Sequence, residues 1–89
     1  MDADILPDTL AEVRQAIDAL DSQLIGLLAR RQQLVAQAGR LKPKHDAQAG
    51  AAPERVVQVL KARREQAAAA GLSPDVAEAV WQAMIAAFI

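Results

Sequence analysis

The sequence predicts an all-α fold, with three helices per chain assembled into an intertwined homodimer. About half of the residues are apolar, mostly Ala, Leu and Val, with four glycines, four prolines and only two aromatic residues. This composition is typical of a helical protein. The second observation is a seam whose steps alternate between four and three residues, the spacing of a helix that packs along its whole length. The seam consists of Val13, Ile17, Leu20, Leu24, Leu27, Arg31, Leu34, Ala38 and Leu41.

This seam predicts a first helix over residues 9–42. Thr9 and Glu12 form a capping-box pattern at its start, and Pro43 ends it because the residue before a proline is pushed out of the α region. Such a helix is about 50 Å long, whereas a compact chain of this size is roughly 30 Å across. We therefore expect a second subunit to cover part of the seam, and a homodimer is the simplest closed arrangement.

Two shorter helices are expected over residues 53–70 and 74–89, and the whole chain, 1–89, is expected to form one domain. Pro53 opens the second helix and Gly71 terminates it. Ser73-Pro74-Asp75 starts the third. The apolar face of the second helix is predicted to be Val56, Val57, Leu60, Ala67 and Ala70, and that of the third Val76, Val80, Ala83, Met84, Ala87 and Phe88.

Composition and charge exclude several classes of function. The formal net charge is −1 and aromatic residues are scarce, which argues against a nucleic-acid surface. The chain has no cysteine, so disulfides and thiolate chemistry are excluded. No apolar run has the length of a signal or membrane-spanning segment, and a cytoplasmic protein is expected. Residues 44–52 lack apolar periodicity and are predicted to form a loop that acts as a lid.

The cations of the first helix suggest an anion site. Arg31 lies in the apolar seam, where a charge is costly unless it is paired, so it meets either a buried carboxylate or a cavity that receives an anion. Lys42 follows about 16 Å along the helix and only about 20° around it, and because each side chain can lean inward by several ångströms, the gap then left suits a small dicarboxylate. Arg14 is about 25 Å from Arg31, so in an antiparallel dimer it would reach the site of the other chain.

Several stretches resemble the all-helical chorismate mutase family. They are the run from Leu10 to Asp21 (LAEVRQAIDALD), the run from Leu27 to Arg31 (LLARR), Arg40-Leu41-Lys42, and Pro53-Glu54-Arg55-Val56. The resemblance covers the chain from Leu10 onward, and its most specific feature is three separated cations together with the I-D-x-L-D pattern. The family fold is an intertwined dimer of three-helix chains with shared sites.

The resemblance implies a role for each candidate residue. Arg14 from the partner chain, Arg31 and Lys42 match the cations that bind the substrate carboxylates and ether oxygen, and Glu54 matches the glutamate that contacts the substrate hydroxyl. The implied reaction is the Claisen rearrangement of chorismate to prephenate, with Arg31, Lys42 and Glu54 as catalytic residues. It requires no nucleophile, metal or cofactor, and none is expected here. The expected partners are a dicarboxylate substrate and a second copy of the chain, but neither nucleic acid nor a membrane.

The sequence also departs from the mutase pattern. Many family mutases carry an arginine and an aspartate at the positions of Pro53 and Gly50, and in this respect the chain is closer to the related isochorismate pyruvate lyases. The loop over residues 44–52 is, however, longer than that of the lyases and offers Asp46 as a candidate substitute carboxylate. The family's late glutamine falls about three residues past Ile89, so the native chain is expected to continue. A lyase acting on isochorismate and a non-catalytic helical dimerisation module therefore remain alternatives to the favoured mutase.

Overall fold

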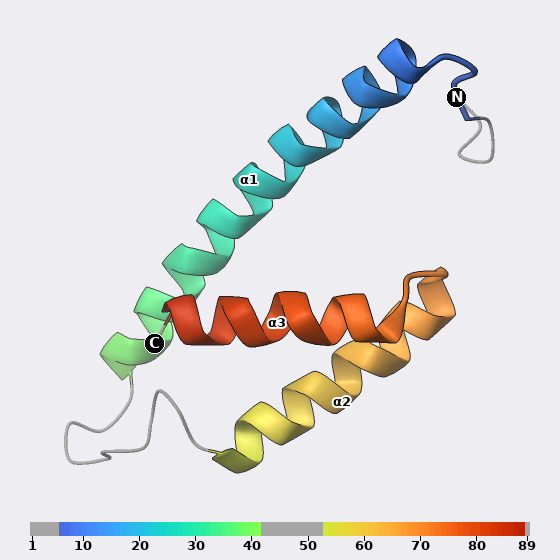
Figure 1. The fold of residues 1–89 in the computed structure, drawn as a ribbon. Coiled ribbons are helices and arrows are strands. Elements are labelled where there is room, and N and C mark those ends of the chain that lie inside the picture. The colour runs from blue at the N-terminus through green and yellow to red at the C-terminus, as the bar shows by residue number, and fades with distance from the viewer. Residues whose placement is uncertain (1–5, 42–52, 89) are drawn as a thin grey trace. The chain divides into compact units, whose positions relative to one another are not determined.

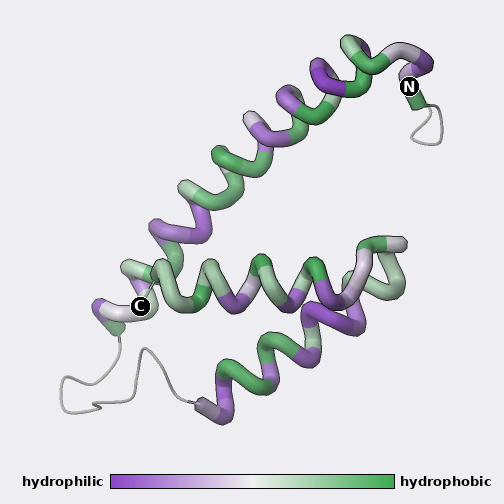
Figure 2. The backbone as a smooth tube through the Cα atoms, in the orientation of Figure 1, coloured by the Kyte–Doolittle hydropathy of each residue, from purple (hydrophilic) through white to green (hydrophobic). Residues whose placement is uncertain are grey.

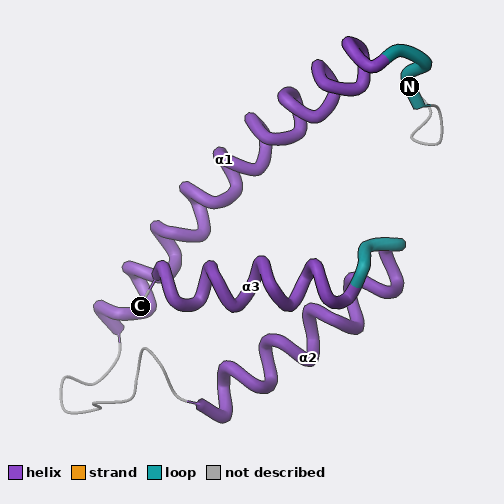
Figure 3. The backbone as a smooth tube through the Cα atoms, viewed as in Figure 1, coloured by secondary structure: helices purple, strands orange, loops and turns teal. Residues whose placement is uncertain are grey.

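The structure, a computed structural model, describes residues 6–41 and 53–88 of the chain. Three helices occupy them: α1 (Leu10–Leu41), α2 (Pro53–Ala70) and α3 (Pro74–Phe88) (Figure 1). Within these two described ranges there is no β-strand (Figure 3). The prediction of an all-α chain with three helices, the first much the longest, is therefore confirmed. The chain divides into two compact units at Leu34 and Val35, inside α1.

The N-terminus of α1 is capped by its own side chains. The Thr9 Oγ1 accepts a hydrogen bond from the Glu12 backbone N–H at 3.1 Å, and its hydroxyl donates to Glu12 Oε1 at 2.9 Å. The Thr9 carbonyl accepts the first helical bond, from the Val13 N–H at 2.9 Å. These contacts confirm the predicted pairing of Thr9 with Glu12, which gives the Glu12 N–H a partner that the helix itself does not supply.

The seam of α1 is exposed in the single chain. None of its 32 residues is buried, and Figure 2 shows apolar and polar positions interspersed along the helix. Six large apolar residues of the seam are exposed to solvent, from Ile17 at 50% to Leu41 at 75%. A helix of this length in water depends mainly on the packing of its apolar face. The single chain does not supply that packing.

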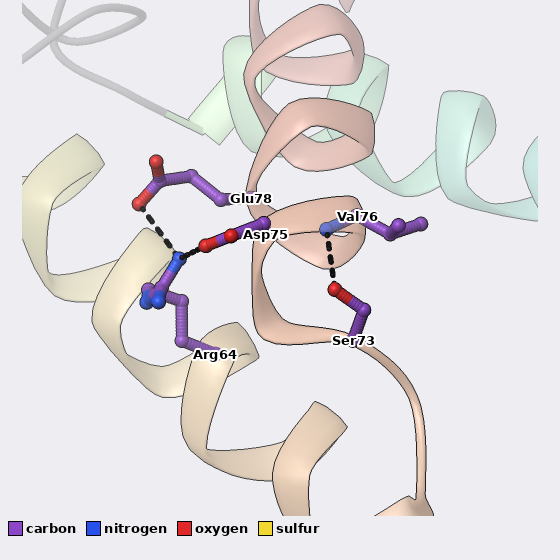
Figure 4. Close-up of polar contacts among 5 residues, drawn as sticks. All are labelled: Arg64, Ser73, Asp75, Val76 and Glu78. Carbon is purple, nitrogen blue, oxygen red and sulfur yellow. Dashed lines mark hydrogen bonds and ion pairs between the residues drawn. The ribbon is translucent and has the colours of Figure 1, made fainter.

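A glycine and a serine make the connection between α2 and α3. Gly71 has a φ of +81°, a left-handed conformation that glycine adopts without penalty. The Leu72 N–H donates to the Ala67 carbonyl at 2.8 Å and the Gly71 N–H to the Ala68 carbonyl at 3.3 Å, the paired bonds of a Schellman cap. Ser73 Oγ then accepts from the Val76 N–H at 3.4 Å (Figure 4). The predicted stop at Gly71 and start at Ser73 are confirmed.

α2 and α3 pack through alanines. Ala67, 5% exposed, and Ala77, 1% exposed, are the only buried residues in the described part of the chain. The predicted inner face of α3 holds only in part for the single chain: Val76 and Val80 remain 50% and 45% exposed, whereas Met84 and Phe88 are half-buried. Ala77 and Trp81, each one position after those valines, are less exposed, so the less exposed face of α3 is turned by about one residue from the predicted one. This face includes Ala77, Trp81, Met84 and Phe88, of which the last two were predicted.

Candidate active site

Two of the candidate cations lie on α1. Arg14 is exposed in the second turn, and Arg31 is half-buried in the second half of the helix. The two residues are 17 positions apart, which corresponds to about 25 Å along the axis. A rigid helix cannot bring both guanidinium groups to one small ligand, so within a single chain Arg14 and Arg31 do not form one pocket.

Arg31 is more shielded than the seam residues around it. Its exposure is intermediate, whereas Leu27 and Leu34, one turn before and after it, are 64% and 61% exposed. Its Nη1 atom is inaccessible to solvent. A guanidinium holds its charge under all ordinary conditions and donates in a fixed fork that matches a carboxylate. The position thus suits an anion-binding arginine, while the alternative of a structural ion pair stays open.

Glu54 and Lys42 complete the predicted set. Glu54 is exposed in the first turn of α2, where a carboxylate interacts favourably with the positive end of the helix dipole. Lys42 lies outside the described residues, as do Gly50, Asp46 and the predicted lid at 44–52. Arg14 and Arg31 belong to the first compact unit and Glu54 to the second.

The structure adds a charged cluster to which the sequence analysis gave no role. Arg64 Nη1 on α2 lies 3.0 Å from Asp75 Oδ1 and 3.6 Å from Glu78 Oε1 on α3 (Figure 4). Arg63 stacks over the Trp81 ring with 5.7 Å between its Cζ and the ring centroid. Two acidic residues three apart in the first two turns of α3, following the basic pair Arg63-Arg64 on α2, are a signal that could have indicated this cluster.

A hollow of about 500 Å³ lies beside Arg64. Glu54, the predicted site residue that the structure places on α2, is not among the residues that line it. Its lining consists of Val57, Leu60, Lys61, Arg64, Glu65 and Glu78.

In residues 6–41 and 53–88, no three His, Cys, Asp or Glu side chains come together as a metal site would require. None of the described helices combines the length and the hydropathy needed to cross a membrane.

Comparison with known proteins gives the family. The chorismate mutase type II family model matches residues 13–89. The T-protein of Haemophilus influenzae is 44% identical over 73 residues, which is 82% of this chain. The T-protein of Enterobacter agglomerans is 39% identical over 71 residues, or 80% of the chain. The chain spans only 19% of the length of each of these relatives. No solved structure gives a significant match. Because the family match extends over most of its length, the chain belongs to the chorismate mutase type II family, a family of isomerases.

Proposed function

We propose that this chain catalyses the Claisen rearrangement of chorismate to prephenate. The observation that carries the proposal is the family match over residues 13–89, a range that contains Arg14, Arg31, Lys42 and Glu54. The reaction breaks one C–O bond and forms one C–C bond within the same molecule, so no group is transferred. The protein therefore has to orient the substrate and stabilise charge, and residues of these types can do both.

Each candidate residue has a part in the proposed mechanism. Arg31, and Arg14 from the partner chain, pair with the two carboxylates and hold the flexible dianion in its reactive chair, an orientational contribution. Lys42 donates to the ether oxygen, where negative charge grows as the C–O bond breaks. Glu54 accepts a hydrogen bond from the substrate hydroxyl, which fixes the orientation of the ring.

The proposal includes an intertwined homodimer, in which residues 1–89 of each chain form one domain. Its support is the exposed seam of α1 together with a single-chain core of only two alanines in the described residues. A chain of this size that folds alone has to bury a large part of its apolar surface, because that burial must offset the conformational entropy lost on folding. A second copy would cover the seam and would also bring Arg14 to the site of Arg31. A cytoplasmic location stays a prediction from composition.

One observation favours a second candidate, an isochorismate pyruvate lyase. Pro53 begins α2 directly before Glu54, where many mutases have an arginine, and Gly50 replaces an aspartate. Both substrates are dicarboxylates and both reactions are intramolecular, so the arginines and Lys42 would serve either one. We favour the mutase because the three cations and Glu54 meet the needs of the rearrangement.

The products separate these functions. The purified protein is given chorismate and isochorismate in separate reactions, and the products are identified. Prephenate from chorismate at the higher kcat/KM is expected, whereas salicylate and pyruvate from isochorismate at the higher kcat/KM would identify a lyase. If neither substrate reacts and neither raises the Tm at saturation, as a ligand selective for the folded state must, the chain is a dimerisation module.

A further inference from the structure

The contact between α2 and α3 is a pivot: the two helices meet closely at one point, about which α2 can tilt relative to α3. Its buried centre consists of Ala67 and Ala77, whose methyl groups allow the two helices to approach closely. The crossing angle of packed helices is set by side chains that interdigitate as ridges and grooves. Alanine has no atoms beyond Cβ with which to form such ridges. The alanine contact therefore sets how closely the helices approach, and their angle depends on the longer side chains beside it, among them those of the half-buried Trp81 and Met84.

Longer side chains brace this pivot. Arg64 places one nitrogen between the carboxylates of Asp75 and Glu78, at 3.0 and 3.6 Å (Figure 4). The side chains of Arg64 and Glu78 are 39% and 40% exposed, whereas that of Asp75 is 90% exposed, so the pair with Glu78 is partly shielded and the pair with Asp75 is open to water. A shared cation in a network constrains geometry better than an isolated surface pair does. Arg63, the next residue of α2, stacks on Trp81 of α3, so the two contacts lie in different directions around α2.

Small changes of tilt are amplified at the other end of α2. Between Pro53 and Ala70 the helix contains no internal glycine or proline, so it has none of the usual causes of a kink. Glu54 precedes Arg64 by ten residues, or about 15 Å along the axis. A tilt of about 4° at Arg64 therefore displaces Glu54 by about 1 Å, a distance that can cost on the order of 100-fold in rate at a reacting centre.

We propose that Arg64 is a positioning residue: its bridge to Asp75 and Glu78 sets the tilt of α2 on α3 and thereby the place of Glu54. This inference rests on the proposed function, in which Glu54 contacts the substrate. Arg64 itself touches no substrate. The bridge also gives a role to Asp75 and Glu78, two acidic residues three apart near the start of α3.

A double-mutant cycle tests whether Arg64 acts through Glu54. Arg64→Gln is expected to lower kcat/KM about tenfold in the wild-type background and to have almost no effect in a Glu54→Gln background, because coupled residues are not additive. Where rates are below detection, the same cycle is measured on the Kd for chorismate. Arg64→Lys, which keeps the charge, should retain most of the activity. Lys61→Gln removes a cation from the same helix without breaking an ion pair, and should leave kcat/KM unchanged.

A distance measurement tests the tilt without reference to activity. The chain lacks cysteine, so cysteines introduced at the exposed positions Gln58 and Gln82 give specific spin labels on α2 and α3. Labelled chains are diluted into an excess of unlabelled protein so that only distances within one chain are measured. Arg64→Gln should broaden or shift the distance distribution, and Lys61→Gln should not.

Two results would overturn the inference. One is an equal loss of activity on Arg64→Gln in both Glu54 backgrounds, which would indicate a general structural role. The other is an unchanged distance distribution. A wild-type protein that converts neither chorismate nor isochorismate refutes the proposed function itself and removes the basis of the inference. That failure is read from the wild type alone and is distinguishable from the other two.

Discussion

Arg31 is the one charged residue among the nine positions of the α1 seam, and its role decides what the seam is for. If Arg31 binds a substrate carboxylate, the substitution Arg31→Ala removes catalysis and leaves the fold intact. If Arg31 instead neutralises a buried carboxylate, the same substitution leaves that charge unpaired and destabilises the protein by several kcal/mol, about 3–5 for a buried pair. The two roles thus predict opposite effects on stability and activity.

We expect Arg31→Ala and Lys42→Ala each to reduce kcat/KM by about tenfold to a hundredfold, and by more where the partner charge stays buried. A lost charge-assisted contact costs about 1.5–3 kcal/mol, and more where the partner charge stays buried. Helix content, measured by circular dichroism, should be retained in both variants. Arg30→Ala is the matched control, since Arg30 is an exposed cation one residue outside the seam. An unfolded Arg31→Ala protein together with a fully active Lys42→Ala protein would show that Arg31 is structural.

At the scale of the helix elements, two glycines have opposite expected effects. Gly71 has a positive φ of 81°, whereas Gly26 lies inside α1, and a Cβ at either would meet no atom within 4 Å. Gly71→Ala should destabilise by roughly 1–2 kcal/mol because the left-handed conformation is unfavourable for alanine. Gly26→Ala should stabilise by about 0.5–1 kcal/mol because glycine weakens a helix interior.

The midpoints of urea unfolding measure both changes, provided that the m-value stays constant. Equal destabilisation by the two substitutions would contradict the account. A destabilising Gly26→Ala substitution would mean that another chain approaches the α1 backbone closely at that point.

Local sequence signals predicted how the helices begin and end, whereas the packing faces were harder to predict. Thr9, Gly71 and Ser73 act on backbone groups within a few residues of themselves, so their patterns carry the information needed. α3 is different because apolar residues lie on more than one side of it. Periodicity alone could not show that α2 packs on the stripe containing Ala77 rather than on the one containing Val76.

At the scale of the whole molecule, we expect an obligate dimer. α1 exposes its apolar seam, and the described part of one chain buries only two alanines, so a monomer would have too little core to offset its conformational entropy. Sedimentation equilibrium in the micromolar range should give twice the chain mass of 9.5 kDa. Dilution should lower the Tm, since dissociation is coupled to unfolding. A folded, helical monomer at micromolar concentration would contradict this expectation.

The candidate site could be predicted from the sequence only as a set of residue types. Spacing along one helix placed Arg14 about 25 Å from Arg31, which excluded a shared pocket within one chain. The spacing of residues could not place Glu54 relative to the arginines, because that placement depends on tertiary packing, which no local sequence pattern encodes. The roles of Arg14, Lys42 and Glu54 came from the resemblance to the family, whose membership the match over residues 13–89 establishes.

The most direct test of the shared mutase site mixes two inactive variants. Arg14→Ala and Arg31→Ala chains are unfolded together, refolded and assayed for prephenate formation. If Arg14 acts across the dimer, each mixed dimer contains one intact site. Random pairing makes about half of the dimers mixed, so about a quarter of the wild-type activity should return. A mixture as inactive as its two parents, with mixed dimers shown to be present, would contradict a site shared between the two chains.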